Sequence, residues 1–320
     1  MTHPKSILVT GCAGFIGSNF VKAFQKKYPH TQIIGLDDLS SGRKQLVPSS
    51  VVFYKGSITN QRLVQSLFKK HAPEFVFHFA AVPRVSYSVE YPRETTDVNV
   101  LGTVTLLEAA RAHKVTRFIY SSSSSLYGGA KKLPTKESEN VAFPKSPYAV
   151  QKYVGEHFCR VYSELHGMDT ISLRYFNVYG PNQYGDSPYS TVISAWLEAL
   201  YFPKKKKAFL EGNGSKTRDF CYVGNVVSAN MKAMESSKRF DGLACNIAHG
   251  ERTSIRTVKK LLEKMTGKTL DLEQRPDRRG DVSHTHADIS LAKKSLGYAP
   301  EVRFEEGLAL TVQWFETRKK

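Results

Sequence analysis

Short apolar runs recur along the first 120 residues, each with the length of a buried strand. Between the first two runs, Ile16, Phe20 and Phe24 recur at helical spacing, and a second helical pattern is expected over residues 96–113. Strands that alternate with helices over this length predict an α/β fold with a doubly wound parallel sheet. The expected strands are residues 7–9, 32–36, 51–54, 75–79 and 117–120.

A glycine loop directly follows the first predicted strand. Gly11, Gly14 and Gly17 allow a sharp turn, close approach of a ligand to the backbone, and tight packing of the next helix on the sheet. That helix opens near Phe15 and Ile16, and its N-terminal N–H groups suit a pyrophosphate. A tight turn with no ligand is the alternative interpretation.

Asp37 ends the second predicted strand, twenty residues after the last glycine of the loop. In a dinucleotide-binding unit this place holds the carboxylate that accepts hydrogen bonds from the adenosine ribose. Strand, loop, helix, strand and acid in this order therefore predict a Rossmann-type lobe that binds NAD. Asp37 and Asp38 would repel a 2′-phosphate, which favours NAD over NADP, and the turn at Ser41 and Gly42 is expected beside the adenosine.

Five serines, residues 121–125, follow the fifth predicted strand at the sheet edge where such folds bind ligands. A flexible linker is the alternative, but a buried strand directly before the serines favours a hydroxyl-lined site. Further on, Tyr148 and Lys152 are four residues apart and share one face of a predicted helix. A surface tyrosine stacked on a lysine stem has the same spacing. The functional interpretation is a proton-transfer pair, because an ammonium near a phenol lowers a pKa that starts at about 10.

Composition changes this picture little. The net charge of +17 raises nucleic acid as a partner, but the 46 basic residues are spread along the chain and only residues 204–207 form a block. No zinc finger or RNA-binding aromatic motif accompanies that block, so nucleic-acid binding ranks last. The four cysteines show neither CxxC nor metal-ligand spacing, which predicts core residues in a reducing cytoplasm and no metal. The N-terminal residues lack an apolar signal core, and no run reaches membrane-spanning length.

Three motifs in combination resemble the extended short-chain dehydrogenase/reductases: Thr-Gly-x-x-Gly-x-x-Gly from Thr10, the serine-rich strand end before Tyr127, and Tyr-x-x-x-Lys from Tyr148. Within that superfamily the chain is similar to the UDP-hexose 4-epimerases, most of all to those acting on UDP-N-acetylglucosamine. The similarity runs from about residue 5 to residue 317. Further segments that agree are residues 173–181, 217–223, 245–248, 278–281 and 287–288.

The resemblance implies roles for particular residues. Tyr148 would be the base, Lys152 the group that tunes it, and Ser123 the hydroxyl beside O4 of the sugar. Asn177 would contact the UDP-sugar, while Arg218 and Arg278 would hold its pyrophosphate, which a planar guanidinium suits. The remaining residues expected to contact the cofactor are Ser57, Ile58, Ala80, Ala81, Asn99 and Tyr175.

The chain departs from the family pattern at two places. Ser57 stands where relatives usually have an aspartate that accepts from the adenine amino group, so this contact is expected to be weaker. Ser124 and Ser125 stand where dehydratases carry Asp-Glu and the related decarboxylases retain an acid. Without a carboxylate there, epimerisation is the simpler chemistry. A UDP-sugar dehydratase or decarboxylase remains the alternative, as does a non-catalytic NAD-sensing protein, which would not need the proton pair.

The resemblance also implies which sugar fits. In similar epimerases, the residue four beyond the aspartate of Arg-x-Gly-Asp lies beside the C2 substituent. Counted from Asp281, this residue is Thr285, which is small enough to leave room for an N-acetyl group. We therefore expect a 4-epimerase that interconverts UDP-N-acetylglucosamine and UDP-N-acetylgalactosamine, and UDP-glucose and UDP-galactose more slowly. An ordinary strand residue, with the pocket walled elsewhere, is the alternative for Thr285.

The expected organisation is two joined lobes. Residues 1–176 form the NAD-binding domain and residues 177–320 a smaller mixed α/β UDP-sugar-binding domain, with about 220–250 returning to the first. Helices near 96–113 and 147–166 pair across the homodimer interface in similar proteins, so a homodimer is expected here. The predicted location is the cytoplasm.

Overall fold

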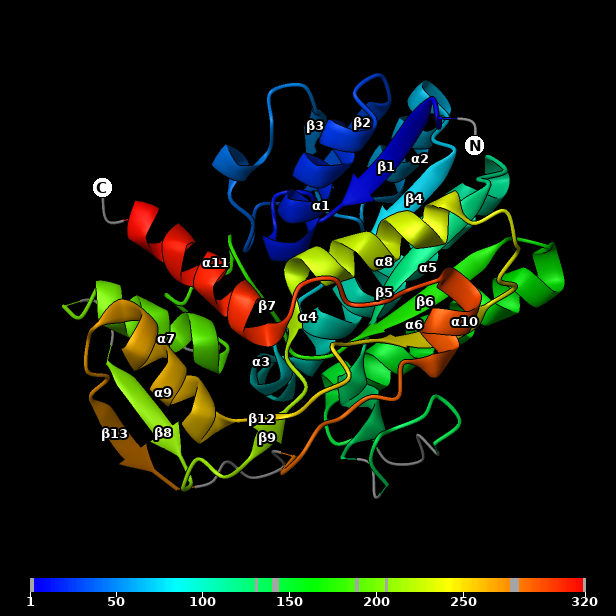
Figure 1. Cartoon of the computed structure of the whole chain (residues 1–320). Helices are drawn as coiled ribbons and strands as arrows, with labels where there is room; N and C mark the ends of the chain where they lie inside the picture. Colours follow the sequence, from blue (N-terminus) through cyan, green and yellow to red (C-terminus); the bar gives the residue numbers. More distant parts are fainter. Residues whose placement is uncertain are drawn as a thin grey trace.

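A seven-stranded sheet forms the centre of the computed structural model, in the order β11-β6-β5-β4-β1-β2-β3 (Figure 1). Every neighbouring pair is parallel, which confirms the predicted doubly wound sheet. The strands are β1 (Ser6–Thr10), β2 (Gln32–Asp37), β3 (Val52–Lys55), β4 (Phe75–His78), β5 (Arg117–Ser123), β6 (Thr170–Tyr175) and β11 (Leu243–Ile247). The structure describes residues 3–129, 132–139, 144–187, 190–204, 207–276 and 282–318.

Helices cover both faces of this sheet, because successive strand residues point to opposite faces and both faces are apolar. Ile7 and Val9 of β1 join one core, and Leu8 between them joins the other. The first core is closed by α1 (Phe15–Lys27), α8 (Val223–Glu235) and α10 (Ser290–Leu296). The second is closed by α2 (Gln61–His71), α5 (Gly102–Ala112) and α6 (Pro147–His166).

Two elements extend three or four residues beyond their predicted limits. Strand β5 runs on to Ser123, because its last three residues pair in register with β6. The helix expected over residues 96–113 begins four residues earlier, because Pro92 occupies its first turn, where a missing N–H is tolerated. It continues as α4 (Pro92–Thr96), a π-helical turn η2 (Asp97–Leu101) and α5. The short helices α3 (Val85–Glu90), η1 (Lys44–Leu46) and η3 (Ser124–Tyr127) complete this lobe.

The second part of the chain builds a smaller lobe to one side of the sheet, seen at the left of Figure 1. Its core contains Trp196, Phe220, Leu262 and Phe315. The chain does not stay there, since α8 packs on α1 and β11 joins the main sheet. The elements of the smaller lobe are β7 (Val178–Tyr179), α7 (Val192–Tyr201), β8 (Ala208–Glu211), β9 (Thr217–Arg218), β10 (Cys221–Tyr222), β12 (Thr253–Ser254), α9 (Ile255–Thr266), β13 (Leu272–Arg275) and α11 (Phe304–Thr317).

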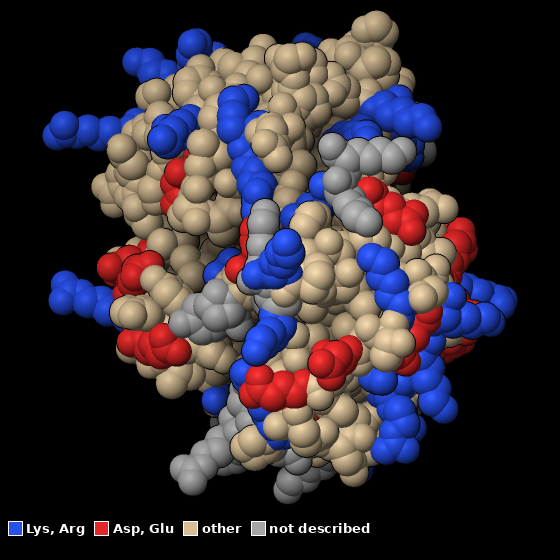
Figure 2. All heavy atoms as spheres, turned by 90° about the vertical axis from the view of Figure 1, so that its left-hand side faces the viewer, with Lys and Arg blue, Asp and Glu red and all other residues tan. Residues whose placement is uncertain are grey.

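The surface and the cysteines agree with the interpretation of the composition. All four cysteines are buried with free thiols, as expected of core residues. On the face shown in Figure 2, basic side chains are spread out with acidic ones among them instead of forming one continuous patch. In the described part of the chain, no helix is both long enough and apolar enough to cross a membrane.

Candidate active site

The carboxyl ends of the parallel strands meet along one edge of the sheet, where folds of this kind bind ligands. A cleft of about 560 Å³ lies there, bounded on its other side by the smaller lobe. That volume is within the usual range for a ligand site. The predicted residues that line the cleft are Gly11, Gly14, Phe15, Ile16, Gly17, Asp37, Asp38, Ser41, Ile58, Ala80, Ala81, Ser123, Tyr148, Tyr175, Asn177, Arg218 and Thr285.

The glycine loop forms a cradle that only bare backbone can make. Gly11 has a φ of +69°, and a Cβ there would lie 2.7 Å from the Ala80 nitrogen. A Cβ on Gly17 would lie 2.1 Å from the Gly11 carbonyl oxygen. Gly14 is the N-cap of α1 and brings no capping side chain, so the helix N-terminus meets the cleft as bare backbone. Such an end suits a phosphate group, and the cradle therefore fits a dinucleotide.

Asp37 is buried at the end of β2 and shapes the cradle as well as lining it. Its Oδ2 accepts a hydrogen bond from the Ala13 N–H, 2.9 Å away, and its Oδ1 accepts one from the Leu39 N–H, also 2.9 Å away. Burial raises the pKa of the Asp37 carboxyl, although these two N–H donors oppose the shift. Asp38 is exposed and accepts hydrogen bonds from Ser40. The two acids thus differ, since only Asp37 holds the backbone of the glycine loop.

Four predicted site residues are not part of the cleft lining. Gly42 packs against Asp37 and Ala13, where a Cβ would come within 3 Å of both residues. Asn99 is buried and binds the backbone of Val82, accepting from its N–H at 2.8 Å. The Ser57 hydroxyl forms a hydrogen bond with the Thr59 hydroxyl, 2.8 Å away. The fourth is Lys152. Arg278 and Asp281 lie outside the described residues.

The predicted proton-transfer pair, Tyr148 and Lys152, lies where α6 packs against β5. The Tyr148 N–H donates to the Ser88 hydroxyl, which fixes the first turn of α6. The Lys152 ammonium donates to the carbonyl oxygen of Ser121, 2.7 Å away, and lies 5.9 Å from the centroid of the Tyr148 ring. Ser123 is hydrogen-bonded to the Tyr148 phenol. The structure thus brings Ser123, Tyr148 and Lys152 together, with the lysine behind the tyrosine.

Burial is the largest cause of the pKa shifts of Tyr148 and Lys152. It raises the pKa of Tyr148 to about 12, while the hydrogen bond from Ser123 lowers it. Burial lowers the pKa of Lys152 to about 8. The hydroxyl of Ser123 thus favours the phenolate, which spacing along the sequence did not reveal.

The sequence also did not reveal how the cleft is bridged beside Asp37. Arg43 and Asp186 line the cleft from its two sides and form an ion pair. The Arg43 guanidinium also lies 3.6 Å from the centroid of the Tyr184 ring. Nearby, Arg84 donates to the Ser187 hydroxyl at 2.6 Å. No local pattern could have predicted the ion pair, because its partners are 143 residues apart in the chain.

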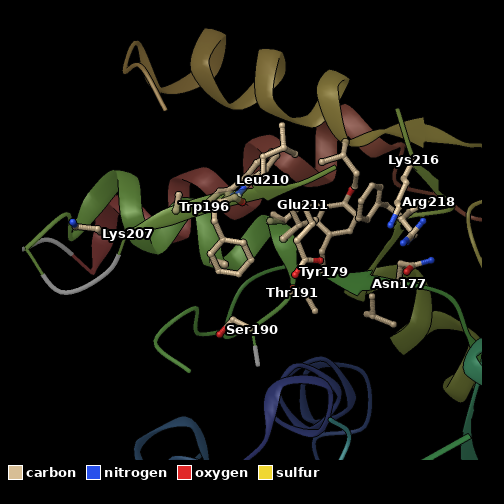
Figure 3. Close-up of a pocket in the computed structure, with 18 residues that line it drawn as sticks. Asn177, Tyr179, Ser190, Thr191, Trp196, Lys207, Leu210, Glu211, Lys216 and Arg218 are labelled. Carbon is tan, nitrogen blue, oxygen red and sulfur yellow. The ribbon is translucent and has the colours of Figure 1, made fainter. Parts of the chain in front are cut away.

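A second pocket of about 270 Å³ opens from the cleft into the smaller lobe. Asn177 and Arg218 line both spaces, and Figure 3 shows them together at one end of the pocket, opposite Lys207. Much of the pocket wall is apolar and aromatic, namely Tyr179, Val192, Trp196, Phe209, Leu210 and Phe220. The two spaces thus form one continuous site with a cation at their junction.

Thr285 is fixed in the wall of the cleft by its hydroxyl. Its Oγ1 accepts hydrogen bonds from Asn177 Nδ2 at 2.9 Å and from the Asp219 N–H at 3.0 Å. Asn177 Nδ2 also donates to the Asp219 carbonyl at 3.0 Å. Both N–H bonds of the Asn177 side-chain amide are therefore used within the protein. The oxygen of this side chain, Oδ1, is the atom that could bind a ligand.

Carboxylates among the described cleft residues are confined to one end. Asp37, Asp38 and Asp186 all lie near the Arg43 bridge, and the residues that follow Ser123 are hydroxylic. An acid that could remove a proton from carbon or donate one to a leaving hydroxyl is thus lacking beside Ser123 in the described lining.

Known proteins resemble the chain over nearly its whole length. A family model described as GDP-mannose 4,6 dehydratase matches residues 8–311. The UDP-glucose 4-epimerase of Thermotoga maritima, solved with UDP-glucose, is 35% identical with a TM-score of 0.92, covering 98% of this chain and all of that one. The UDP-N-acetylglucosamine 4-epimerase of Methanobrevibacter ruminantium, in complex with UDP-N-acetylmuramic acid, is 32% identical with a TM-score of 0.90, covering 99% and 100%. The UDP-glucuronic acid 4-epimerase of Bacillus cereus, in complex with its UDP-sugar and NAD, is 31% identical with a TM-score of 0.87, covering 98% and 99%.

Asp37→Ala should weaken NAD binding by about 10–100-fold, because hydrogen bonds to a charged group contribute roughly 1.5–3 kcal/mol. Asp38→Ala is the matched control, since it removes a neighbouring exposed carboxylate that binds only Ser40 and should weaken binding much less. Calorimetric titration of the cofactor-stripped variants measures both. Tighter binding of NADP than of NAD by the wild type would contradict the assigned role of Asp37.

Proposed function

The chain belongs to the extended short-chain dehydrogenase/reductases and is an NAD-dependent UDP-sugar 4-epimerase. We propose that it interconverts UDP-N-acetylglucosamine and UDP-N-acetylgalactosamine. UDP-glucose and UDP-galactose are slower substrates in this proposal. The observation that carries it is Thr285, a small side chain in the cleft wall whose hydroxyl is held by Asn177 and Asp219. A side chain so held cannot swing into the space that an N-acetyl group needs.

The UDP part of the substrate occupies the second pocket in this proposal. The aromatic wall around Trp196 and Phe209 suits a uracil ring, since stacking and burial of an aromatic ring are both favourable there. Arg218, at the junction, faces the pyrophosphate, and its planar guanidinium matches phosphate oxygens. The sugar then lies in the cleft between Thr285 and the end of β5.

Tyr148 carries the proton chemistry. Its phenolate removes the proton from O4 of the sugar, and the Ser123 hydroxyl, hydrogen-bonded to that phenol, binds the same oxygen. Bound NAD supplies the hydride acceptor for C4 and then returns the hydride. The 4-keto sugar turns about its pyrophosphate linkage, which Arg218 holds, and presents its other face. Tyr148 then gives the proton back to O4, so C4 is inverted without net oxidation.

The competing hypotheses lack support at named positions. A dehydratase or decarboxylase needs an acid beside Ser123, and the described lining there offers only hydroxyls. A non-catalytic NAD sensor has no need of Tyr148 and Lys152, which the fold brings to one place with Ser123. One assay separates these functions: incubation with UDP-N-acetylglucosamine, followed by NMR of the sugar. A C4 epimer supports the proposal, and a deoxy-keto sugar would select the dehydratase. Unchanged UDP-N-acetylglucosamine, in a protein that epimerises UDP-glucose, would overturn the choice of sugar.

The proposal includes a homodimer built on α5 and α6. Apolar residues recur every three or four positions along α6, at Val150, Val154, Phe158, Val161 and Leu165. Leu165 is 73% exposed and Val161 41%. Leu101, which is 56% exposed, directly precedes α5 as its N-cap. An apolar stripe of this spacing suits the same stripe of a second copy, because the two helix pairs can then bury each other.

Tyr148→Phe should lower kcat by about 10²–10⁴-fold, the usual contribution of a positioned acid/base group. Fold and NAD content should stay as in the wild type, because only the phenolic oxygen is lost. Stopped assays with both UDP-sugars, alongside circular dichroism and cofactor quantification, give the result. A folded, NAD-loaded Tyr148→Phe variant with wild-type kcat would remove Tyr148 from the mechanism.

Thr285→Tyr should raise the barrier for the N-acetylated pair by about 1–3 kcal/mol, the typical cost of overlap in a packed site, with a smaller effect on UDP-glucose and UDP-galactose. Thr285→Val is the matched control, since it also loses the hydrogen bonds to Asn177 and Asp219 but keeps the size of the threonine. The measurement is kcat/KM for both sugar pairs in all three proteins. Equal losses on both pairs in Thr285→Tyr would show that Thr285 does not select the sugar.

Leu101→Glu combined with Val161→Glu should convert the dimer to a monomer, because two charges would be buried in the apolar contact. Leu310→Glu is the matched control, as it changes an apolar residue of similar chemistry, 38% exposed, on α11. Light scattering during gel filtration measures the molar mass. A wild-type protein that is monomeric at micromolar concentration would contradict this part of the proposal.

A further inference from the structure

Three consecutive residues at the end of β5 each contact one residue on the same face of α6. On α6, Tyr148, Lys152 and Glu156 are spaced by four residues and so face the same way. Each meets one of three consecutive serines: Tyr148 bonds Ser123, Lys152 donates to the Ser121 carbonyl, and Glu156 accepts from the Ser122 hydroxyl. The first two contacts involve the proposed catalytic groups, and the third has no role so far.

Glu156 is itself held rigidly from the other side. Arg174 of β6 donates to both of its carboxylate oxygens, from Nε at 2.9 Å and from Nη2 at 2.7 Å. Arg174 stands directly opposite Ser122 in the sheet register and also donates to the Tyr127 phenol at 2.8 Å. Glu156, Arg174 and Ser122 are all buried. A fork of two parallel bonds fixes both the position and the orientation of the carboxylate.

Several charged and titratable groups surround Lys152, and they differ in the charge that they can supply. Tyr148, Glu156 and Cys159 face Lys152 from α6, Tyr120 lies beside it from β5, and His78 does so from β4. Burial lowers the pKa of Lys152, while Cys159 and then Glu156 raise it. Of these groups Glu156 alone is a carboxylate. A change at Glu156 therefore acts on the lysine both through the Ser121–Ser123 segment and through the local field.

We propose that Glu156 is a positioning residue of the epimerase: anchored by Arg174, it sets the register of the β5 end against α6 and supplies the negative charge that faces Lys152. The inference rests on the roles proposed above for Ser123, Tyr148 and Lys152. Glu156 touches neither substrate nor cofactor in this account, and it acts through the serine segment and the lysine.

The test is Glu156→Gln in the NAD-loaded enzyme, with kcat and KM measured across pH. Glutamine keeps the shape and the hydrogen bond from Ser122 but loses the charge. We expect kcat to fall roughly tenfold or more, since small misplacements of catalytic groups can lower rates by up to about 10², with KM changed less than about twofold. The pKa of Lys152 should fall, so the ammonium is lost at lower pH and the alkaline limb of the kcat profile should move to lower pH.

Glu198→Gln is the matched control. Glu198 is also buried and paired with an arginine, since Arg318 donates to it at 2.8 Å, but it lies on α7, away from β5. It should lower thermal stability as Glu156→Gln does and leave the alkaline limb in place. If the single Glu156 variant does not fold, Glu156→Gln with Arg174→Gln leaves no unpaired charge in this pair and should show the same fall in kcat. Its alkaline limb should move less, because the positive charge of Arg174 is lost as well.

The outcomes separate this inference from the proposed function. A wild-type kcat and pH profile in folded Glu156→Gln, or an equal shift in Glu198→Gln, would overturn the role of Glu156 alone, provided that Tyr148→Phe is inactive. Wild-type turnover in Tyr148→Phe would instead overturn the catalytic roles on which the inference is built.

Discussion

The parallel direction of all seven strands is the constraint on which the rest of the structure depends. It sends every carboxyl end to the same edge of the sheet, so groups far apart in the chain become neighbours: the Gly11 loop, Asp37, Ala80 and Ser123. It also requires both faces to be covered, because neither face of a parallel sheet tolerates water well. The helices that meet this need are also those that carry the site, since α1 presents its N-terminus and α6 presents Tyr148.

The contact between α6 and β5 shows how such a covering helix can be placed accurately. Gly155 allows the approach, because a Cβ there would lie 2.2 Å from the Tyr120 hydroxyl oxygen. Apolar packing by Cys159 and Tyr162 holds the C-terminal half of α6 to the sheet. Hydrogen bonds to residues 121–123 fix the N-terminal half of α6. Apolar contacts could not specify the rotation and register of the helix as narrowly.

Much of the fold could be predicted because its signals are local. Apolar runs, the glycine spacing and the acid at the end of β2 each lie within a few residues, and together they define the dinucleotide lobe. The extension of β5 to Ser123 could not be predicted, since serines do not look like a strand and only the pairing with β6 makes them one. The place of these serines at the carboxyl edge of the sheet nevertheless predicts a site.

Only those features of the site that follow from the spacing of residues along the sequence could be predicted. The four-residue interval placed Tyr148 and Lys152 on one face, but it could not show that the ammonium binds the Ser121 carbonyl behind the phenol. Asn99 and Gly42 support the cleft from behind, a distinction that depends on side-chain direction. The bridge from Arg43 to Asp186 joins two loops without strong patterns, so nothing near either residue announces the other.

That bridge has a consequence for the response of the enzyme to its medium. Arg43 and Asp186 are both partly exposed, whereas Arg174 and Glu156 are buried. Ions in solution screen exposed charges within about 8–10 Å at physiological ionic strength and reach buried pairs much less. Added salt will therefore loosen the contact between the lobes beside Asp37 while it leaves the contact between α6 and the sheet intact. Ionic strength should act on the contact between Arg43 and Asp186 across the cleft, and not on the arrangement of the groups proposed to transfer protons.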